Sequence, residues 1–306
     1  MAIPTRLLGS TGVRVSVLGL GGYHIGQMKN QRDAIRVTHA AIDAGITFMD
    51  NAWEYHDGRA EVVMGEATAD RRDRVFLMTK LCTHGRGRRE AMTQLEQSLR
   101  RLKTDFLDLW QIHECVYDND PDLHFAKGGA VEALEDARRQ GKVRFIGFTG
   151  HKHPSIHLAM LASRFPFDTC QLPLNCFDAT FRSFEQQVLP ELLSRRIAPL
   201  GMKSLSGDAR QVRHKVVSAA EALRYAMSLP VATTISGIDS MRVLKQNVAV
   251  ADDFTPMSDR QMERLRTRVR EEAADGRYEL YKTTAMHDGP VGRKQHGFPD
   301  DETLSP

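Results

Sequence analysis

The chain has 306 residues, 41% of them hydrophobic and 26% charged, with a formal net charge of +3. This composition is typical of a globular protein, and without a block of basic residues it gives no indication of nucleic-acid binding. Four cysteines form no CxxC pair, the first residues lack the apolar segment of a signal peptide, and no stretch is long enough to span a bilayer. We therefore expect a cytoplasmic protein with free thiols, no structural zinc and no membrane partner.

The first predicted element is a β-hairpin in the stretch TRLLGSTGVRVS, whose two runs are joined by Gly9, Ser10, Thr11 and Gly12. Short apolar runs then alternate eight times with segments of helical periodicity. The apolar runs, predicted to be strands, cover residues 15–20, 47–50, 75–80, 106–113, 143–149, 169–173, 198–203 and 233–236. The predicted helices cover residues 33–44, 60–69, 89–102, 130–140, 154–163, 183–195, 218–228 and 240–251. Because each step between parallel strands needs a crossover helix, this order predicts an α/β fold, a (β/α)8 TIM barrel with an N-terminal hairpin and a C-terminal extension.

An open, doubly wound sheet is the alternative fold, and the stretch GLGGYHIG near the start favours it at first sight. Its glycines are Gly19, Gly21, Gly22 and Gly26, and their spacing does not fit the GxGxxG pattern of dinucleotide-binding folds. Close approach of the backbone at a strand end is the better explanation for these glycines.

We expect residues 1–252 to form a single barrel domain and residues 253–306 to form a C-terminal helix and an irregular tail packed on or near the barrel. The stretch MSDRQMERLRTRVREEAADG predicts the helix. Tyr278, Tyr281 and Phe298 are candidates to anchor the tail over a face of the barrel, and the final residues are predicted to be disordered.

Ionisable side chains follow three successive predicted strands at the point where each strand ends. Asp50 closes the second strand with Tyr55 in the next loop, Lys80 closes the third strand and His113 closes the fourth. The carboxyl ends of barrel strands open on one face, where active sites are assembled. We expect Lys80 to pair with Asp50 and to lower the pKa of Tyr55 toward physiological pH, which would make the phenol a general acid.

In this order and spacing, the four residues Asp50, Tyr55, Lys80 and His113 resemble the aldo-keto reductase family. The resemblance implies reversible hydride transfer between a nicotinamide and a carbonyl compound. In that reaction Tyr55 would donate the proton, His113 would orient the carbonyl group, and Lys80 and Asp50 would tune Tyr55.

The resemblance also implies a set of coenzyme contacts, with three departures from the family pattern. Gly150 stands where the family has an amide side chain, and Met202 stands where many members stack a tyrosine on the nicotinamide. The implied coenzyme-binding residues are Thr149, Gln171, Met202, Lys203, Ser204, Ser206, Gly207, Gly237, Arg242, Gln246 and Asn247. The usual basic residues for a 2′-phosphate are missing, so Arg242 or Lys245 would replace them. NADP(H) is favoured, with NAD(H) as the alternative.

Substrate contacts are expected from Tyr23, His24 and Trp53, from the long loop 114–129 and from the tail. Strand alternation from an inward His113 places Trp110 outward, under the helices.

The predicted function is NAD(P)H-dependent reduction of aldehydes, ketones or sugar carbonyls, with a small carbonyl or alcohol substrate as the partner. A nicotinamide-binding regulatory or redox-sensing subunit with little turnover is the second hypothesis. A metal-dependent barrel hydrolase would need several His and Asp ligands at strand ends, and the first strand offers none. We therefore predict no metal site, and the sequence leaves the physiological substrate and the oligomeric state open.

Overall fold

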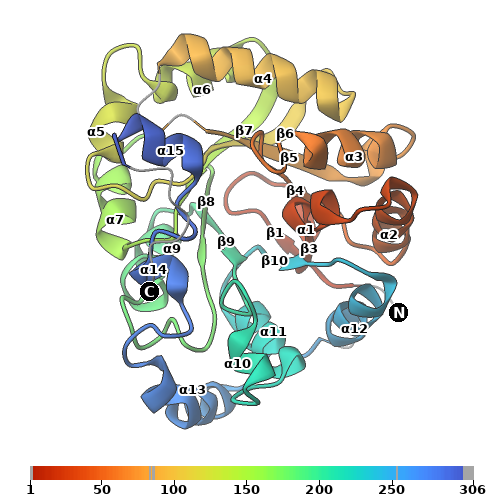
Figure 1. Cartoon of the computed structure of the whole chain (residues 1–306), viewed down its shortest axis with the longest axis vertical. Coiled ribbons are helices and arrows are strands. Elements are labelled where there is room, and N and C mark those ends of the chain that lie inside the picture. Colours follow the sequence, from red (N-terminus) through yellow and green to blue (C-terminus); the bar gives the residue numbers. More distant parts are fainter. Residues whose placement is uncertain (1–2, 83, 85–86, 253, 299–306) are drawn as a thin grey trace.

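Eight parallel strands close into a barrel in the computed structural model, which describes residues 3–82, 84, 87–252 and 254–298. The strands follow the order β10, β3, β4, β5, β6, β7, β8, β9 around the barrel (Figure 1). Their bounds are β3 Leu18–Gly21, β4 Phe48–Asp50, β5 Phe76–Leu81, β6 Leu107–Ile112, β7 Val143–Thr149, β8 Thr169–Pro173, β9 Ala198–Met202 and β10 Thr233–Gly237. The predicted (β/α)8 barrel is confirmed.

Alternation along each strand divides the apolar side chains into two clusters. Phe48, Phe76 and Leu109 belong to the cluster inside the barrel, where the rings of Phe48 and Phe76 stack with centres 5.2 Å apart. Trp110 is fully buried in the second cluster, between the strands and the helices, together with Leu95 of a surrounding helix. The outward placement of Trp110 is therefore confirmed.

The predicted N-terminal hairpin is formed by β1 (Thr5–Leu7) and β2 (Arg14–Ser16), which pair antiparallel. Leu8 and Val15 of this hairpin join the interior cluster and so close one end of the barrel. The predicted strand 15–20 is wrong in one respect, because it is divided between β2 and β3. Ser16 causes the break, since its hydroxyl donates a hydrogen bond of 2.6 Å to the carbonyl oxygen of Leu18.

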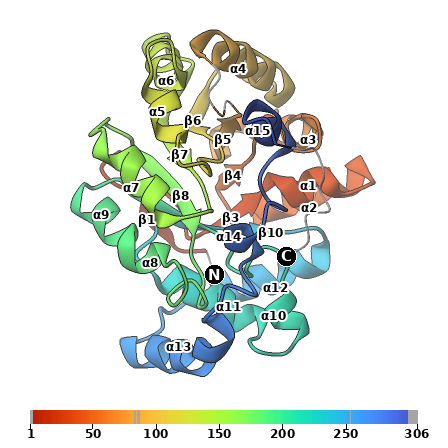
Figure 2. The ribbon, with the colours of Figure 1, turned by 60° about the vertical axis from the view of Figure 1, so that its left-hand side comes forward.

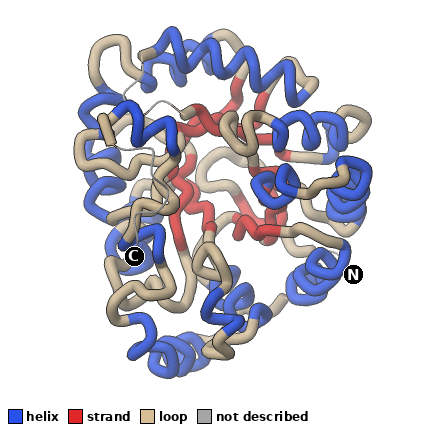
Figure 3. Tube along the Cα trace, in the orientation of Figure 1, coloured by secondary structure: helices blue, strands red, loops and turns tan. Residues whose placement is uncertain are grey.

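Helices surround the strands on the outside of the barrel (Figure 3). The helices at the predicted positions are α2 (Gln31–Asp43), α3 (Arg59–Thr68), α4 (Arg88–Leu102), α6 (Ala130–Arg139), α7 (Pro154–Ala162), α8 (Phe184–Gln187), α9 (Leu189–Ser194), α11 (Ala219–Ser228) and α12 (Met241–Asp252). The single helix predicted over residues 183–195 is divided into α8 and α9. Pro190, near the start of α9, has no amide hydrogen to continue the bonding pattern of α8.

Further helices lie in the loops and the tail. Their bounds are α1 (Gly22–Gln27), α5 (Asp120–Phe125), α10 (Arg210–Arg213), α13 (Asp259–Ala273), α14 (Leu280–Thr283) and α15 (Pro290–Gln295), with a short 3-10 turn at Arg72–Arg74. The predicted charged helix is α13, which begins with a capping box between Ser258 and Gln261. The expected loop 114–129 contains α5, so it is not an irregular loop throughout.

The tail runs from α13 past α14 to α15, the dark blue segment of Figure 2. Lys282 of α14 is fully buried, and its ammonium group lies 2.6 Å from Asp178 and 2.9 Å from Glu279. Tyr278 and Tyr281 are buried as expected, whereas Phe298 is 47% exposed and does not serve as a core anchor. The final residues 299–306 lie outside the described residues, and the division of the chain at residue 252 stays a prediction.

Replacing Lys282 by Met should lower the free energy of unfolding by about 3–5 kcal/mol, because the carboxylates of Asp178 and Glu279 would stay buried without their cation. Urea unfolding measures the change. The matched control is Lys294→Met, because Lys294 lies exposed on α15. Equal stabilities of the two variants would show that the Lys282 ion pairs do not hold the tail.

Candidate active site

The carboxyl ends of the strands surround a cavity of about 950 Å³. Asp50, Thr149, Met202 and Gly237, each the last residue of its strand, line this cavity. The predicted site residues along its wall are Tyr23, His24, Asp50, Trp53, Tyr55, His113, Thr149, Gln171, Met202, Lys203, Ser204, Gly207 and Gly237. The structure therefore brings most of the predicted set together at one end of the barrel.

Lys80 and Asp50 form a buried ion pair immediately behind the cavity wall. The Lys80 ammonium nitrogen lies 2.6 Å from Asp50 Oδ1 and also donates to the carbonyl oxygen of Asn51 at 2.7 Å. Lys80 is 1% exposed and Asp50 3% exposed. Because a lone buried charge is costly, the two groups depend on each other, as the sequence predicts.

Tyr55 lies at the cavity wall, with its ring centre 5.2 Å from the Lys80 ammonium nitrogen. Burial raises the pKa of Tyr55 well above its usual value, and the neighbouring charges of Asp50 and Glu54 raise it further. The expected lowering of this pKa toward physiological pH is therefore wrong, because burial and the nearby carboxylates shift it in the opposite direction. At neutral pH the phenol therefore keeps its proton.

His113 follows β6 and faces Tyr55, with the two ring centres 5.5 Å apart in an edge-on arrangement. Its Nδ1 lies 2.6 Å from Oε1 of Glu54, a residue absent from the predicted site. Burial acts to raise the pKa of Glu54, but the charge and hydrogen bond of His113 outweigh it and lower the pKa to about 2. Glu54 is thus a carboxylate that holds the imidazole. Glu54 directly precedes Tyr55 in the sequence, and this position could have marked it as a candidate site residue.

The loop that carries Glu54 and Tyr55 is fixed to neighbouring elements on both sides. Trp53 donates its backbone N–H to the carbonyl oxygen of Lys80 at 3.0 Å, and its indole N–H donates to Gln97 of α4 at 2.7 Å. Arg101 of α4 donates to the carbonyl oxygen of Trp53 at 3.0 Å. After Tyr55 the chain turns through Gly58 with a φ of 84°, where a Cβ atom would collide with the Arg101 guanidinium.

Two buried side chains of the predicted coenzyme set carry polar atoms without hydrogen-bond partners among the described residues. Gln171 donates its amide N–H to Asp50 at 3.3 Å, but its Oε1 has no partner, and neither has the hydroxyl oxygen of Ser206. Met202 Sδ lies 3.8 Å from Nε2 of Gln171. Burial lowers the pKa of Lys203, in the same region, to about 8.

Of the residues expected to bind the adenosine end of the coenzyme, several lie away from the cavity. Arg242 and Gln246 are exposed on α12, and neither is among the described residues that line the cavity. Asn247 is buried and donates to the hydroxyl of Ser236 at 3.0 Å. Asp239, which the sequence analysis did not select, lines the cavity near Gly237.

Some of the residues expected to contact the substrate line the cavity, and others do not. Tyr23, His24 and Trp53 line the cavity, whereas Glu114 is the one described residue of loop 114–129 that does so. The tail contributes residues 285–291 and Arg293 to the wall. This stretch of the tail has no hydrophobic periodicity. The sequence therefore predicted that the tail contacts the substrate, but not which of its residues do so.

Comparison with known proteins agrees with this architecture. Residues 17–211 match the model of the Aldo/keto reductase family. The chain is similar to the aldo-keto reductase YhdN of Bacillus subtilis (strain 168), with 30% identity over 212 residues, 65% of this chain and 61% of that protein. It is also similar to a probable voltage-gated potassium channel subunit beta of Oryza sativa subsp. japonica, with 38% identity over 138 residues, 42% of this chain and 40% of that protein.

Both alignments span less than two thirds of the relative's own length. Among solved structures, the chain resembles an aldo-keto reductase from Klebsiella pneumoniae in complex with NADPH. The TM-score is 0.72 at 26% identity, covering 91% of this chain and 98% of that chain. Because the family model matches more than half of its residues, the chain belongs to the aldo/keto reductase family.

Proposed function

We propose that this protein is an NADP(H)-dependent oxidoreductase that reduces aldehydes, ketones or sugar carbonyls and runs in reverse on the corresponding alcohols. The observation that carries the proposal is the meeting of Tyr55, the Lys80–Asp50 pair and the His113–Glu54 pair at one cavity. A protonated phenol and an oriented imidazole at the end of a barrel are suited to reduction of a carbonyl group.

The residues present fit a nicotinamide coenzyme. The free Oε1 of Gln171 can accept a hydrogen bond from a carboxamide, and the free hydroxyl of Ser206 can donate one to a phosphate oxygen. Lys203 lines the cavity and adds a positive charge, whereas Ser206 is buried and is not among the described residues that line it. When bound there, the nicotinamide supplies the hydride for reduction.

Tyr55 holds the proton that the carbonyl oxygen receives. Its raised pKa keeps the phenol protonated at neutral pH, which suits donation during reduction. The same shift disfavours the phenolate that would accept a proton from an alcohol. Oxidation of an alcohol would therefore require a higher pH than reduction, at which the phenolate forms.

Glu54 acts through His113 as a positioning residue. The carboxylate accepts the hydrogen bond of Nδ1–H and so fixes the ring, which leaves Nε2 as the nitrogen that orients the carbonyl group. Since the pKa of Glu54 is about 2, the carboxylate stays ionised over the whole pH range in which the enzyme would work.

Tyr55→Phe should reduce kcat by about 10²–10⁴-fold, because the ring stays and the proton donor is lost. Coenzyme binding, measured by quenching of tryptophan fluorescence, should be retained. Tyr23→Phe is the matched control, since Tyr23 also lines the cavity and its ring centre lies 5.3 Å from that of Tyr55. A Tyr55→Phe enzyme with near-normal kcat would exclude Tyr55 as the donor.

Glu54→Gln should lower kcat/KM by about 10–100-fold, the effect of losing a hydrogen bond to a charged group. Glu54→Asp keeps the carboxylate and should therefore be more active than Glu54→Gln. A purely structural role of Glu54 does not predict this difference. The pH profile of kcat/KM is recorded for all three proteins. Full activity of Glu54→Gln across that profile would show that His113 needs no carboxylate.

Coenzyme preference depends on the balance between two oppositely charged residues near the predicted adenosine end. If Arg242 contacts the 2′-phosphate, Arg242→Ala should weaken NADPH binding by about 1.5–3 kcal/mol and leave NADH binding almost unchanged. Asp239→Asn should strengthen NADPH binding relative to NADH, because a carboxylate repels a phosphate and can accept the ribose hydroxyl.

Titration of both coenzymes into both variants separates these contributions. If Arg242→Ala weakened the binding of NADPH and of NADH equally, Arg242 would not contact the 2′-phosphate. Tighter binding of NADH than NADPH by the wild-type protein would overturn the NADP(H) preference itself.

The similarity to a potassium channel β subunit favours a second candidate function, a nicotinamide-binding regulatory subunit with little turnover. A panel of aldehydes, ketones and sugars assayed with each nicotinamide distinguishes the two functions. Tight coenzyme binding without turnover on any carbonyl would favour the regulatory function over the oxidoreductase.

A further inference from the structure

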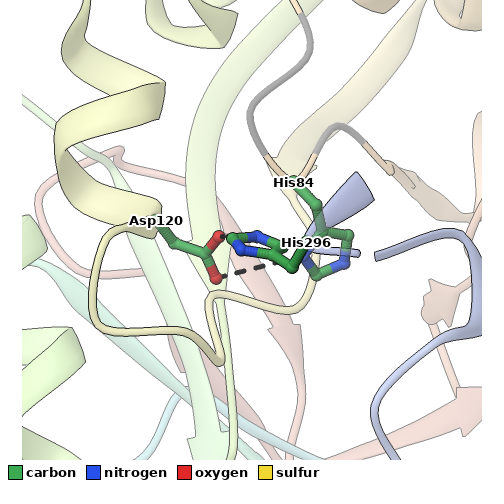
Figure 4. A group of neighbouring side chains, drawn as sticks. All are labelled: His84, Asp120 and His296. Atoms are coloured by element: carbon green, nitrogen blue, oxygen red, sulfur yellow. Dashed lines mark ion pairs between the residues drawn. The ribbon is translucent and has the colours of Figure 1, made fainter. Parts of the chain in front are cut away.

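Three side chains from distant parts of the sequence meet outside the proposed active site (Figure 4). His84 lies in the loop after β5, Asp120 is the first residue of α5, and His296 follows α15 in the tail. None of the three is among the described residues that line the cavity. His84 is 2% exposed and Asp120 is fully buried, so the cluster is part of the interior.

The spacing of the three side chains suits a transition-metal ion. Nε2 of His296 lies 3.3 Å from Oδ1 of Asp120, and Nδ1 of His84 lies 3.9 Å from Oδ2 of the same carboxylate. One ligand atom from each residue lies within 4.8 Å of the other two. In a tetrahedral zinc site with bonds of about 2.0–2.2 Å, neighbouring ligand atoms are about 3.3–3.5 Å apart. A small inward movement of the side chains would complete this geometry.

One potential ligand atom of each residue has no hydrogen-bond partner among the described residues. These atoms are Nδ1 of His84, Oδ1 of Asp120 and Nε2 of His296, and all three are buried. Nε2 of His296 and Oδ1 of Asp120 form an ion pair of 3.3 Å instead, and an ion placed among the three side chains would give each of these buried atoms a direct ligand bond. An imidazole nitrogen and a carboxylate oxygen can share a proton or a metal cation, and the meeting of two imidazoles at one carboxylate suits the metal cation.

The second polar atoms of Asp120 and His84 have partners of their own, which leaves Oδ1 of Asp120 and Nδ1 of His84 for the ion. Asp120 Oδ2 accepts hydrogen bonds of 2.8 Å from the backbone N–H groups of Val116 and Tyr117. Nε2 of His84 lies 3.3 Å from Oε2 of Glu114. A carboxylate on the second nitrogen of a ligating histidine is the usual outer partner in metal sites.

We propose that His84, Asp120 and His296 bind a divalent transition-metal ion of the Zn²⁺ class, with a fourth position open to water. Two imidazoles and one carboxylate favour such an ion over Mg²⁺ or Ca²⁺, which take mainly oxygen ligands. This site differs from the expectation of no metal, which depended on the lack of a CxxC pair and of His and Asp ligands at the end of the first strand.

The ion would fasten the tail at the far side of the cavity. Residues 285–291, which line the cavity, lie between the buried anchor Lys282 and the ligand His296. Lys282 fixes one end of this segment through its ion pairs, and the metal would fix the other end to the β5–α4 loop and to α5. Metal binding therefore controls how firmly this part of the cavity wall is held.

Calorimetric titration of Zn²⁺ into chelator-treated protein tests the site. The wild-type protein should bind one Zn²⁺ per chain. His296→Gln and Asp120→Asn should each weaken Zn²⁺ binding by more than about 100-fold, because loss of a residue that only hydrogen-bonds to a metal ligand already weakens binding by about 10–100-fold. His39→Gln is the matched control, because His39 lies on α2 and contacts the carbonyl oxygen of Ala67. No stoichiometric binding by the wild-type protein would overturn the proposal.

A second group, Glu54, His113 and Glu114, could also hold an ion and must be distinguished. Glu54→Gln should keep Zn²⁺ binding if the ion sits at the proposed cluster. Loss of binding in Glu54→Gln together with retention in His296→Gln would place the ion at the cavity and overturn the proposal. Circular dichroism checks that each variant is folded, and His296, near the end of the described chain, can be changed without touching the barrel.

Trypsin cleavage after the exposed Lys294 reports on the tail directly. At a Zn²⁺ concentration about 100 times the dissociation constant, cleavage of the wild-type protein should slow by about 100-fold, because the ion binds only the docked tail. The same addition should not slow cleavage of His296→Gln. If Zn²⁺ protects both proteins equally, or neither, the ion does not fasten the tail.

Discussion

The buried ion pair between Lys80 and Asp50 is the constraint on which the candidate active site depends. An ammonium group that is 1% exposed is stable only beside a carboxylate, and the parallel pairing of β4 with β5 brings Asp50 to 2.6 Å. The same lysine binds the carbonyl oxygen of Asn51 through its side chain and the N–H of Trp53 through its backbone. The pair therefore fixes both strands and the start of the loop that carries Glu54 and Tyr55.

Burial and carboxylates together set the pKa of Tyr55. Burial raises the pKa of the phenol first, and Asp50, Glu54 and Glu114 add to the effect. A phenol held in its protonated form is a donor rather than an acceptor at neutral pH. In the proposed reaction, the surrounding carboxylates thus keep the phenol in its donor form, and Lys80 holds Asp50 and the loop in place.

The sequence predicted the barrel and the strand-end residues because both depend on local patterns. Asp50 and His113 are each marked by the end of an apolar run, and parallel strands deliver such ends to one face. Glu54 was missed because its contact with His113 depends on the path of a loop between two strands. Arg242 was selected from the family resemblance, but the turn of α12 leaves it exposed. The tail residues of the cavity have no periodic pattern, and long-range contacts such as those of Asp288 with Lys152 and of Gly289 with Glu114 place them.

The tail shows how charge balance can decide where an aperiodic segment packs. At one end, Lys282 sits between Asp178 and Glu279, and the excess of negative charge there is consistent with the burial-raised pKa of Asp178, about 7. At the other end, Asp120 and Glu114 again bring two carboxylates together, beside His84 and His296. A divalent ion at His84, Asp120 and His296 would supply there the positive charge that Lys282 supplies at α14. Both ends of the cavity-lining segment would then be held by the same physical principle, a cation that neutralises buried carboxylates.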